Sequence, residues 1–287
     1  MRKKSITQGV IYASLLSSFT MFTAFRPTAP ATLAACQPAD SAMRAVATSQ
    51  TWLHKIVSAT GQTVLEYNAD KTIRKIVQQQ KSGQETYHVV QLPVYENGRL
   101  VKSLLSDDAN ATTGDLYQTF TYNDNQVATI TYYRDNQEYA YDSLAYDAAG
   151  KMTTRYQFGR NAAKKVWENN GYQQFTWDNE GNITQMDTYG KQPGYSKCVY
   201  TSSVTYTYDN KQNPRQQQPE LFALLEGGAA NLSGHNVLTE AISATNTSQV
   251  ITNTYTYAYN AGKYPVKATF NSGMTADVVK LEWIKLQ

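Results

Sequence analysis

Cysteine and histidine are scarce in this chain, whose 287 residues include two cysteines and three histidines. The histidines show no metal-ligand spacing such as His-x-x-x-His and have no cysteine beside them, which argues against a zinc site. Neither a glycine-rich phosphate loop nor a Gly-x-Ser-x-Gly motif occurs. We therefore expect no metal, no cofactor and no enzymatic activity. A hydrolase whose carboxylates come together from neighbouring strands stays open as an alternative.

An excess of charge is also missing once the N-terminus is set apart. The formal net charge is +3, but residues 1–35 contain four of the 26 basic residues and none of the 23 acidic ones. The rest of the chain therefore carries 22 basic against 23 acidic residues, a net charge of −1. This balance removes the electrostatic case for nucleic acid as a partner.

The N-terminus has the pattern of an export signal, with basic residues at 2–4 followed by a mostly apolar stretch over 6–25. Serines and threonines dilute this stretch, which argues against a permanent membrane span. Leu33-Ala34-Ala35-Cys36 resembles the lipobox of bacterial lipoproteins, in which the cysteine after the cleavage site carries the lipid. We predict a signal peptide over 1–35, a lipidated Cys36 with a flexible tether to residue 50, and one β domain over 51–287. Cleavage by an ordinary signal peptidase near Ala31 or Ala35 is the alternative.

The fate of Cys36 determines the expectation for Cys198. If Cys36 carries a lipid, Cys198 is a lone thiol that we expect to pack as a small hydrophobic side chain. If Cys36 keeps a free thiol in an oxidising compartment, a Cys36–Cys198 disulfide becomes possible. The two expectations exclude each other.

A short phrase occurs seven times between residues 65 and 265: an aromatic residue is followed within two residues by Asp or Asn, and in six copies a glycine or asparagine comes a few residues on. Successive copies lie 28, 27, 24, 31, 31 and 51 residues apart, counted between their aromatic residues. Recurrence at a nearly constant period indicates a repeat architecture. The repeat aromatics are Tyr67, Tyr95, Tyr122, Tyr146, Trp177, Tyr208 and Tyr259.

The phrase is typical of tight turns. Asp or Asn accepts hydrogen bonds from backbone amides two residues on, and glycine adopts the positive φ that closes a short hairpin loop. Where glycine is missing, Asn125 or Asn213 is expected to take that conformation. The predicted turn residues are Asn97, Gly98, Asp147, Gly150, Asp178, Gly181, Asp209, Asn213 and Gly262.

The segments around each turn alternate with a period of two, which predicts β-strands. Met152, Thr154, Tyr156 and Phe158 would share one face, opposite 151, 153, 155 and 157. Two strands per repeat predict an all-β, antiparallel up-and-down meander of about fourteen strands. Because strand twist accumulates, we expect the sheet to curl into a half-barrel, a closed barrel or a spiral.

The 51-residue interval holds a predicted insertion over 215–240. Its segment near 219–226 has leucines at helical spacing and is followed by glycine, which predicts one short helix. Leu221, Leu224 and Leu225 are expected to plug an open end or a concave face of the sheet, rather than to form a ligand lid. The remainder, 229–236, reads as a loop.

Taken together, these motifs resemble a known family. The Tyr-Asp-x-x-Gly phrases resemble the YD (RHS-like) repeats of secreted bacterial proteins. Four features are similar to Bacteroidetes lipoproteins of unknown function with a porin-like β fold: the lipobox, the Tyr-Thr-Tyr-Asp-x-x-x-Asn-Pro phrase at 206–214, the leucine-bearing insertion, and Tyr-x-Tyr-Asn-x-Gly-x-Tyr-Pro at 257–265. The resemblance covers most of 60–287 and implies the fold and an envelope location, without implying any catalytic residue.

The 22 tyrosines and four tryptophans permit two interpretations. Rings at repeat positions are typical of cross-strand ladders that stabilise a sheet, whereas rings exposed together in one groove are typical of sugar-binding platforms. We expect the repeat aromatics to be structural. Turn formation also explains the acidic tips better than calcium binding does, because each tip offers too few carboxylates. Asp142-Ser143-Leu144 matches a Bacteroidetes O-glycosylation site only weakly.

We therefore expect a non-enzymatic envelope lipoprotein that serves as a scaffold or binding protein, with a glycan-binding surface as the alternative. Its expected partners are the membrane, through the lipid on Cys36, and a polysaccharide or another envelope protein. The location would be the outer membrane, on the periplasmic face or the cell surface, or else outside the cell. A transmembrane barrel is disfavoured because Lys151 and Arg155 would carry charge on the lipid face.

Overall fold

The computed structural model describes residues 51–161, 165–192, 194–218, 220–225, 228–273 and 276–286. The predicted signal peptide, Cys36 and the tether lie outside these residues, so the lipidation of Cys36 stays a prediction. Cys198 carries a free thiol and is partly exposed.

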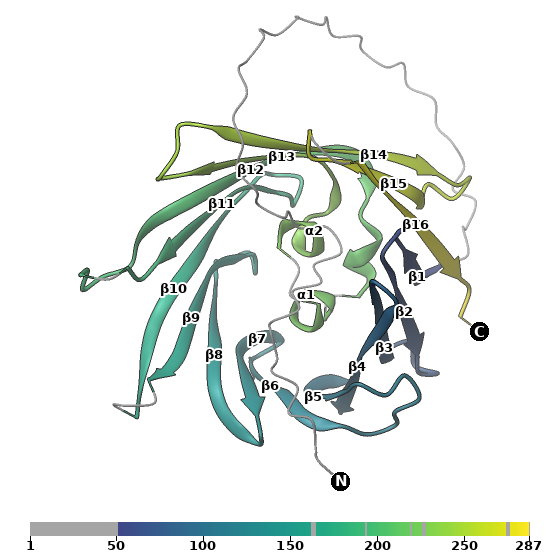
Figure 1. Ribbon diagram of the computed structural model, residues 1–287, viewed down its shortest axis with the longest axis horizontal. Coiled ribbons are helices and arrows are strands. Elements are labelled where there is room, and N and C mark those ends of the chain that lie inside the picture. Colours follow the sequence, from purple (N-terminus) through teal and green to yellow (C-terminus); the bar gives the residue numbers. More distant parts are fainter. Residues whose placement is uncertain are drawn as a thin grey trace, which may run out of the picture.

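The described chain forms one closed antiparallel barrel of sixteen strands, each paired with its neighbours in sequence, and β1 pairs with β16 (Figure 1). The first eight strands are β1 (Trp52–Val57), β2 (Gly61–Tyr67), β3 (Ile73–Ser82), β4 (Glu85–Glu96), β5 (Arg99–Ser106), β6 (Asp115–Asn123), β7 (Gln126–Arg134) and β8 (Gln137–Tyr146). The others are β9 (Met152–Asn161), β10 (Val166–Trp177), β11 (Ile183–Gly190), β12 (Val199–Gln212), β13 (His235–Ala244), β14 (Val250–Tyr259), β15 (Pro265–Asn271) and β16 (Ala276–Ile284).

The all-β meander predicted from the repeats is confirmed, and the sheet is closed rather than open. The seven hairpins account for β2 to β15, and the two further strands are β1 and β16, which pair with each other from opposite ends of the sequence. Their junction has no turn, so it carries no copy of the phrase. Closure leaves the sheet without a free edge.

A β-bulge stands beside every repeat aromatic. In each hairpin the register shifts between the aromatic residue and the residue before it, so that one residue of the opposite strand is left over. An extra residue in one strand reverses which face the following residues occupy. The extra residues are Arg74, Val101, Ala128, Thr153, Thr184, Leu238 and Val266.

The bulge corrects the alternation predicted for β9. Met152 is buried in the core, but the extra residue Thr153 shifts the strand so that Arg155 pairs with the buried Leu144 and faces inward. Tyr156 and Phe158 consequently lie on the outer wall, not on the face of Met152. Arg155 therefore does not charge the outer wall, as the argument against a membrane barrel had assumed.

Helices of the insertion between β12 and β13 form a plug inside the barrel. The insertion contains the 3₁₀-helix η1 (Pro214–Gln217) and the short helices α1 (Leu221–Leu224) and α2 (Ala229–Leu232), and Figure 1 shows α1 and α2 inside the ring of strands. Leu221 and Leu224 are buried in the same core as strand residues such as Ile130, and the partly buried Leu225 packs against it. The Gln118 amide of the wall donates to the carbonyl of Ala223 at 3.3 Å.

The boundaries of this insertion differ from the prediction. Strand β13 begins at His235, so 235–240 belongs to the wall, and 229–232 is helical rather than loop-like. The sequence pattern missed α2 because Ala229–Leu232 is only four residues long and has no capping side chain. It packs against η1 and α1 inside the barrel, and this packing stabilises a helix too short to form alone.

The inner and outer walls differ in polarity. Strand residues that point inward, among them Leu65, Ile76, Phe120 and Phe175, join the apolar core. Residues of opposite parity point outward, and from β7 to β16 many of them are hydroxylated, amide-bearing or charged. Examples are Thr129, Thr131, Ser143, Gln174, Thr176, Gln185, Asp187, Thr205, Thr207, Thr254, Thr256, Lys267, Thr269 and Lys280.

Candidate ligand-binding surface on the outer wall

The repeat aromatics lie on the inner side of the wall, where six of them pack against the core: Tyr67, Tyr95, Tyr122, Tyr146, Trp177 and Tyr208. Most donate a hydrogen bond to the strand that leaves the preceding turn. Tyr122 donates to the carbonyl of Leu100 at 2.9 Å, Tyr146 to that of Val127 at 2.9 Å, and Trp177 to that of Met152 at 2.7 Å. Each acceptor is the residue that pairs with the previous repeat aromatic.

The same link continues around the barrel with local substitutions. Tyr208 donates to the carbonyl of Ile183 at 2.6 Å, and Tyr67 donates to that of Leu53. In the seventh repeat the bond to Val237 comes from Tyr257, at 2.9 Å, whereas Tyr259 donates to Asp209. Tyr95 donates to Glu220 of the plug at 3.1 Å.

Burial raises the pKa of these phenols. For Tyr146, desolvation raises the pKa to about 12, and the nearby Tyr122 adds to the rise. The phenols therefore stay protonated and act as hydrogen-bond donors at neutral pH. This chemistry suits a repeated link between strands.

The turn residues occupy the tips of the hairpins. The Asp147 carboxylate accepts from the amides of Ala149 and Lys151, both at 2.9 Å, and Asp178 accepts from those of Glu180 and Asn182. The left-handed residues with their φ values are Asn97 (52°), Gly98 (76°), Gly150 (81°) and Gly181 (82°).

Three turns differ from the expectation. In the β6–β7 turn the positive φ falls on Asp124 rather than Asn125, and in the β14–β15 turn it falls on Lys263 rather than Gly262. Asn213 has a φ of −72° and caps η1, accepting from the amide of Arg215, because the chain enters the plug there instead of turning back. Asp209 accepts from the amides of Lys211 and Asn236, bracing the same junction.

A second set of aromatic residues, outside the repeat positions, covers the outer wall of β8 to β12. Register places them on the side opposite to the inward-facing Ala140, Gln157 and Gly171. Trp167, Tyr156 and Tyr200 are each 37% exposed. We call this set the outer aromatic band: Tyr141, Tyr156, Phe158, Trp167, Tyr172, Tyr189 and Tyr200.

The rings of the outer aromatic band touch one another in two groups. In one, Tyr141 stacks on Phe158 with centroids 4.5 Å apart and meets the edge of Trp167 at 5.0 Å. In the other, Tyr156, Tyr172, Tyr189 and Tyr200 follow one another across four strands at 4.5 to 5.7 Å. Such contacts hold the rings in place while leaving part of their faces exposed.

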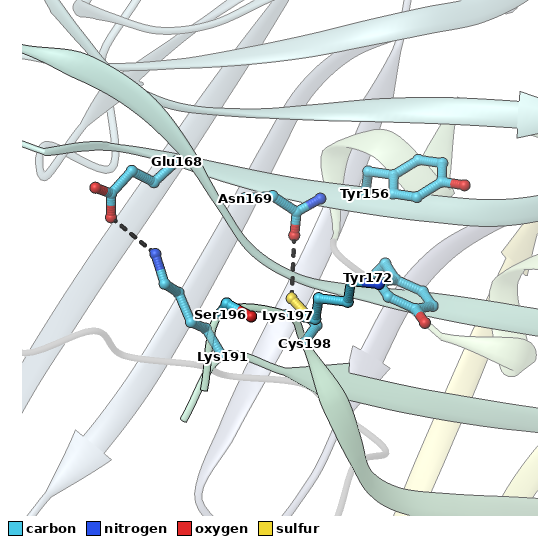
Figure 2. Close-up of a pocket in the computed structure, with 8 residues that line it drawn as sticks. All are labelled: Tyr156, Glu168, Asn169, Tyr172, Lys191, Ser196, Lys197 and Cys198. Carbon is cyan, nitrogen blue, oxygen red and sulfur yellow. Dashed lines mark hydrogen bonds and ion pairs between the residues drawn. The ribbon is translucent and has the colours of Figure 1, made fainter. Parts of the chain in front are cut away.

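A pocket of about 490 Å³ adjoins the band where Lys191 and residues 196–198 lie beside β10. It is lined by Tyr156, Glu168, Asn169, Tyr172, Lys191, Ser196, Lys197 and Cys198, as Figure 2 shows. Lys191 and Glu168 form an ion pair at 3.0 Å, and the Cys198 thiol donates to the Asn169 side-chain oxygen at 3.4 Å. Aromatic rings beside polar groups are the usual composition of a ligand site.

The buried carboxylates Asp142 and Glu240 lie inside the barrel and are separate from the pocket on the outer wall. Asp142 forms an ion pair with Arg155 at 2.5 Å and accepts from Tyr132 at 2.8 Å. Glu240 accepts from Tyr255 at 2.8 Å and from Asn253 at 3.3 Å. Across the described residues, no group of three or more His, Cys, Asp or Glu side chains is arranged to hold a metal. Ser143 lies within β8, paired with Thr129 and Tyr156.

Sequence reasoning found the repeat aromatics but missed the outer aromatic band. The signal for the band is an aromatic residue at a non-repeat position in consecutive strands, such as Tyr156, Tyr172 and Tyr189. Reading that signal requires knowing the bulges, because without them Tyr156 is placed on the face of Met152.

These features define a closed sixteen-stranded barrel with a plug inside it and an aromatic patch on its outer wall. The fold is similar to a porin-like protein from Bacteroides uniformis, with a TM-score of 0.53 and 12% identity over 80% of this chain and 96% of that one. A porin-like protein from Bacteroides vulgatus matches with a TM-score of 0.42 and 12% identity over 82% and 99% of the two chains. No protein-family model matches the sequence, and no curated protein does.

Proposed function

We propose that the protein is a non-enzymatic glycan-binding protein of the cell envelope, held at the outer membrane by a lipid on Cys36. The observation that carries the proposal is the outer aromatic band, because its contacting rings are exposed on one side of the barrel beside a polar pocket. Exposed Tyr and Trp rings bind the apolar faces of sugars, and neighbouring polar groups orient the hydroxyls.

The difference in position and contacts between the two sets of aromatic residues supports this proposal. The repeat aromatics donate their polar hydrogens to backbone carbonyls inside the wall, which is a structural role. The band residues do not follow the repeat, so the architecture alone does not require them. A scaffold role for the whole barrel is compatible with both sets.

An aromatic belt at a membrane interface is the competing explanation of the band. In transmembrane barrels, such belts border an apolar outer surface about 25 Å tall. Here the outward residues flanking the band include Ser143, Gln174 and Asp187, whereas outward apolar residues such as Val77, Val90 and Leu104 lie on β3 to β5. No helix in the described parts of the chain has the length and apolar character needed to span a membrane. The polarity of the wall around the band favours a water-facing glycan surface.

The proposal is tested by screening the purified protein against a glycan array and measuring the affinity of the best ligand by calorimetry. We expect Trp167→Ala and Tyr172→Ala each to weaken binding about tenfold, the equivalent of about 1.4 kcal/mol. Tyr87→Ala is the matched control, because Tyr87 is a 45% exposed tyrosine on β4, away from the band. Undiminished binding by both band variants, or binding to plain phospholipid vesicles through the same rings, would overturn the proposal.

A further inference from the structure

The pocket beside the outer aromatic band offers more hydrogen-bond donors and positive charge than acceptors. Its ionisable side chains of fixed charge are Lys191, Lys197 and Glu168, a formal net charge of +1. We propose that this pocket is the subsite for an anionic group, a carboxylate or a sulfate, on a sugar residue that stacks against Tyr172 or Tyr156. The inference rests on the proposed glycan-binding function and adds the class of glycan.

The two lysines are not equivalent. Lys191 is paired with Glu168 at 3.0 Å, and the same carboxylate accepts from Asn161 at 3.1 Å. These two partners offset the negative charge of Glu168, so that it repels an anionic ligand only weakly. Lys197 is exposed, and among the described residues no carboxylate lies within ion-pair distance of it. An ammonium group that no acid neutralises is available to an incoming anion.

The neutral groups of the pocket point to the same ligand. The side-chain oxygen of Asn169 accepts from the thiol of Cys198, which fixes the amide so that its nitrogen is left to donate. In Figure 2 this nitrogen points toward Tyr156, while the oxygen faces Cys198. The exposed hydroxyl of Ser196 adjoins Lys197 in the chain and lines the same pocket. Lysine, amide and hydroxyl donors together match the oxygens of a carboxylate or sulfate.

The position of the pocket explains why the anion would belong to a sugar. Tyr156 and Tyr172 line the pocket and are also members of the outer aromatic band, with ring centroids 5.7 Å apart. A sugar ring lying on either tyrosine therefore places one substituent into the pocket, while the next residues of the polymer follow Tyr189 and Tyr200. A free inorganic anion has no apolar face that could stack against these rings.

The experiment compares three polymers on the purified protein: a polyuronate, the same polyuronate after reduction of its carboxyl groups, and a sulfated glycan. We expect the reduced polymer to bind at least tenfold more weakly than the polyuronate, and the affinity for the polyuronate to fall as salt is raised. The sulfated glycan tells which anion fits better. Equal affinity for the polyuronate and its reduced form would overturn the inference.

Variants at Lys197 complete the test. We expect Lys197→Glu to weaken polyuronate binding at least tenfold and to leave binding of the reduced polymer unchanged, while Lys197→Arg keeps the affinity within about twofold. Lys267→Glu, an outward lysine on β15, is the matched control for charge. If Tyr172→Ala abolishes binding of all polymers but Lys197→Glu changes none, the glycan function stands and the anionic subsite fails. If no polymer binds at all, both fail.

Discussion

At the scale of single residues, the left-handed backbone conformation is what calls for glycine at a hairpin tip. Gly181 has a φ of 82°, and a Cβ built on it would meet no atom within 4 Å. We expect Gly181→Val to lower the free energy of unfolding by about 1–2 kcal/mol, because a β-branched residue is strained at positive φ. Gly150→Val should lower it at least as much, since the φ of Gly150 is 81° and its added Cβ would lie 3.0 Å from Nε2 of Gln126. Thermal or urea unfolding measures both.

The control for these two variants is Gly190→Ala. Gly190 has no positive φ, and its added Cβ would make an ordinary contact at 3.4 Å with Thr201. We expect this variant to unfold within about 0.5 kcal/mol of the wild type. Loss of equal stability in all three variants would mean that the left-handed backbone is not the cause.

A buried acid provides the second prediction at this scale. Desolvation raises the pKa of Glu240 above its ordinary value of 4.5, and hydrogen bonds from Tyr255 and Asn253 offset part of the rise. The folded protein therefore keeps a proton on Glu240 at a pH where the unfolded chain has lost it. Its contribution to stability is fully present below the unfolded pKa and is lost as pH rises through the folded pKa.

We accordingly expect Glu240→Gln to remove this decline, so that the variant gains melting temperature relative to the wild type as the pH rises above 4.5, the ordinary pKa of this group. Melting curves at several pH values provide the measurement. Glu282→Gln, at an exposed position of β16, should leave the pH profile unchanged. A wild-type profile that rises over this range in parallel with that of Glu240→Gln would contradict the assignment.

At the scale of the hairpin, the two sets of aromatic residues should separate stability from binding. We expect Trp177→Ala to lower the free energy of unfolding by about 3 kcal/mol, because it removes a ring packed against the core and its bond to Met152. We expect Tyr200→Ala, in the outer aromatic band, to change stability by less than about 0.5 kcal/mol while weakening glycan binding. Thermal melts and calorimetry on the two variants measure both quantities, and the opposite pattern would reverse the two roles.

The hairpins were predictable because turn chemistry is local. Asp147 and Gly150, or Asp178 and Gly181, act on backbone groups no more than four residues away, and a pattern of that length is visible in the sequence. The bulges were not predictable, since a residue such as Thr153 is an extra one only relative to its partner strand. The outer aromatic band went unrecognised for the same reason, because the face of Tyr156 depends on the bulge before it.

At the scale of the whole molecule, the sequence did not determine whether the sheet closes or which strand residues the insertion contacts. Whether a curled sheet closes depends on β1 meeting β16, a pairing of residues such as Leu53 and Trp283 that are 230 positions apart. The leucines of the insertion indicated a plug, but their partners, such as Ile130 and Gln118, come from strands far from them in the chain.

The pairing of β1 with β16, which closes the barrel, leads to a further prediction. Trp283 donates to the carbonyl of Pro265 at 2.8 Å and packs against Tyr264 with centroids 5.0 Å apart. We expect Trp283→Ala to loosen β16 from its neighbours, lowering the melting temperature and exposing unpaired strand edges that associate between molecules. Light scattering at increasing protein concentration measures this association. The control is Tyr200→Ala, which lies away from the seam and should stay monodisperse.

The hydrogen bonds that tie most hairpins to the previous one have counterparts on both sides of the β1–β16 seam, from Trp283 to Pro265 and from Tyr67 to Leu53, and Leu53 pairs with Trp283. Such a ring has no first or last member. The barrel therefore does not depend on which strand comes first in the chain. Trp52 and Ile284 are paired neighbours, so a short linker can join them while new ends are opened at the exposed Ser82–Glu85 turn. A circular permutant built in this way should fold to the same barrel, with its plug and outer aromatic band in place.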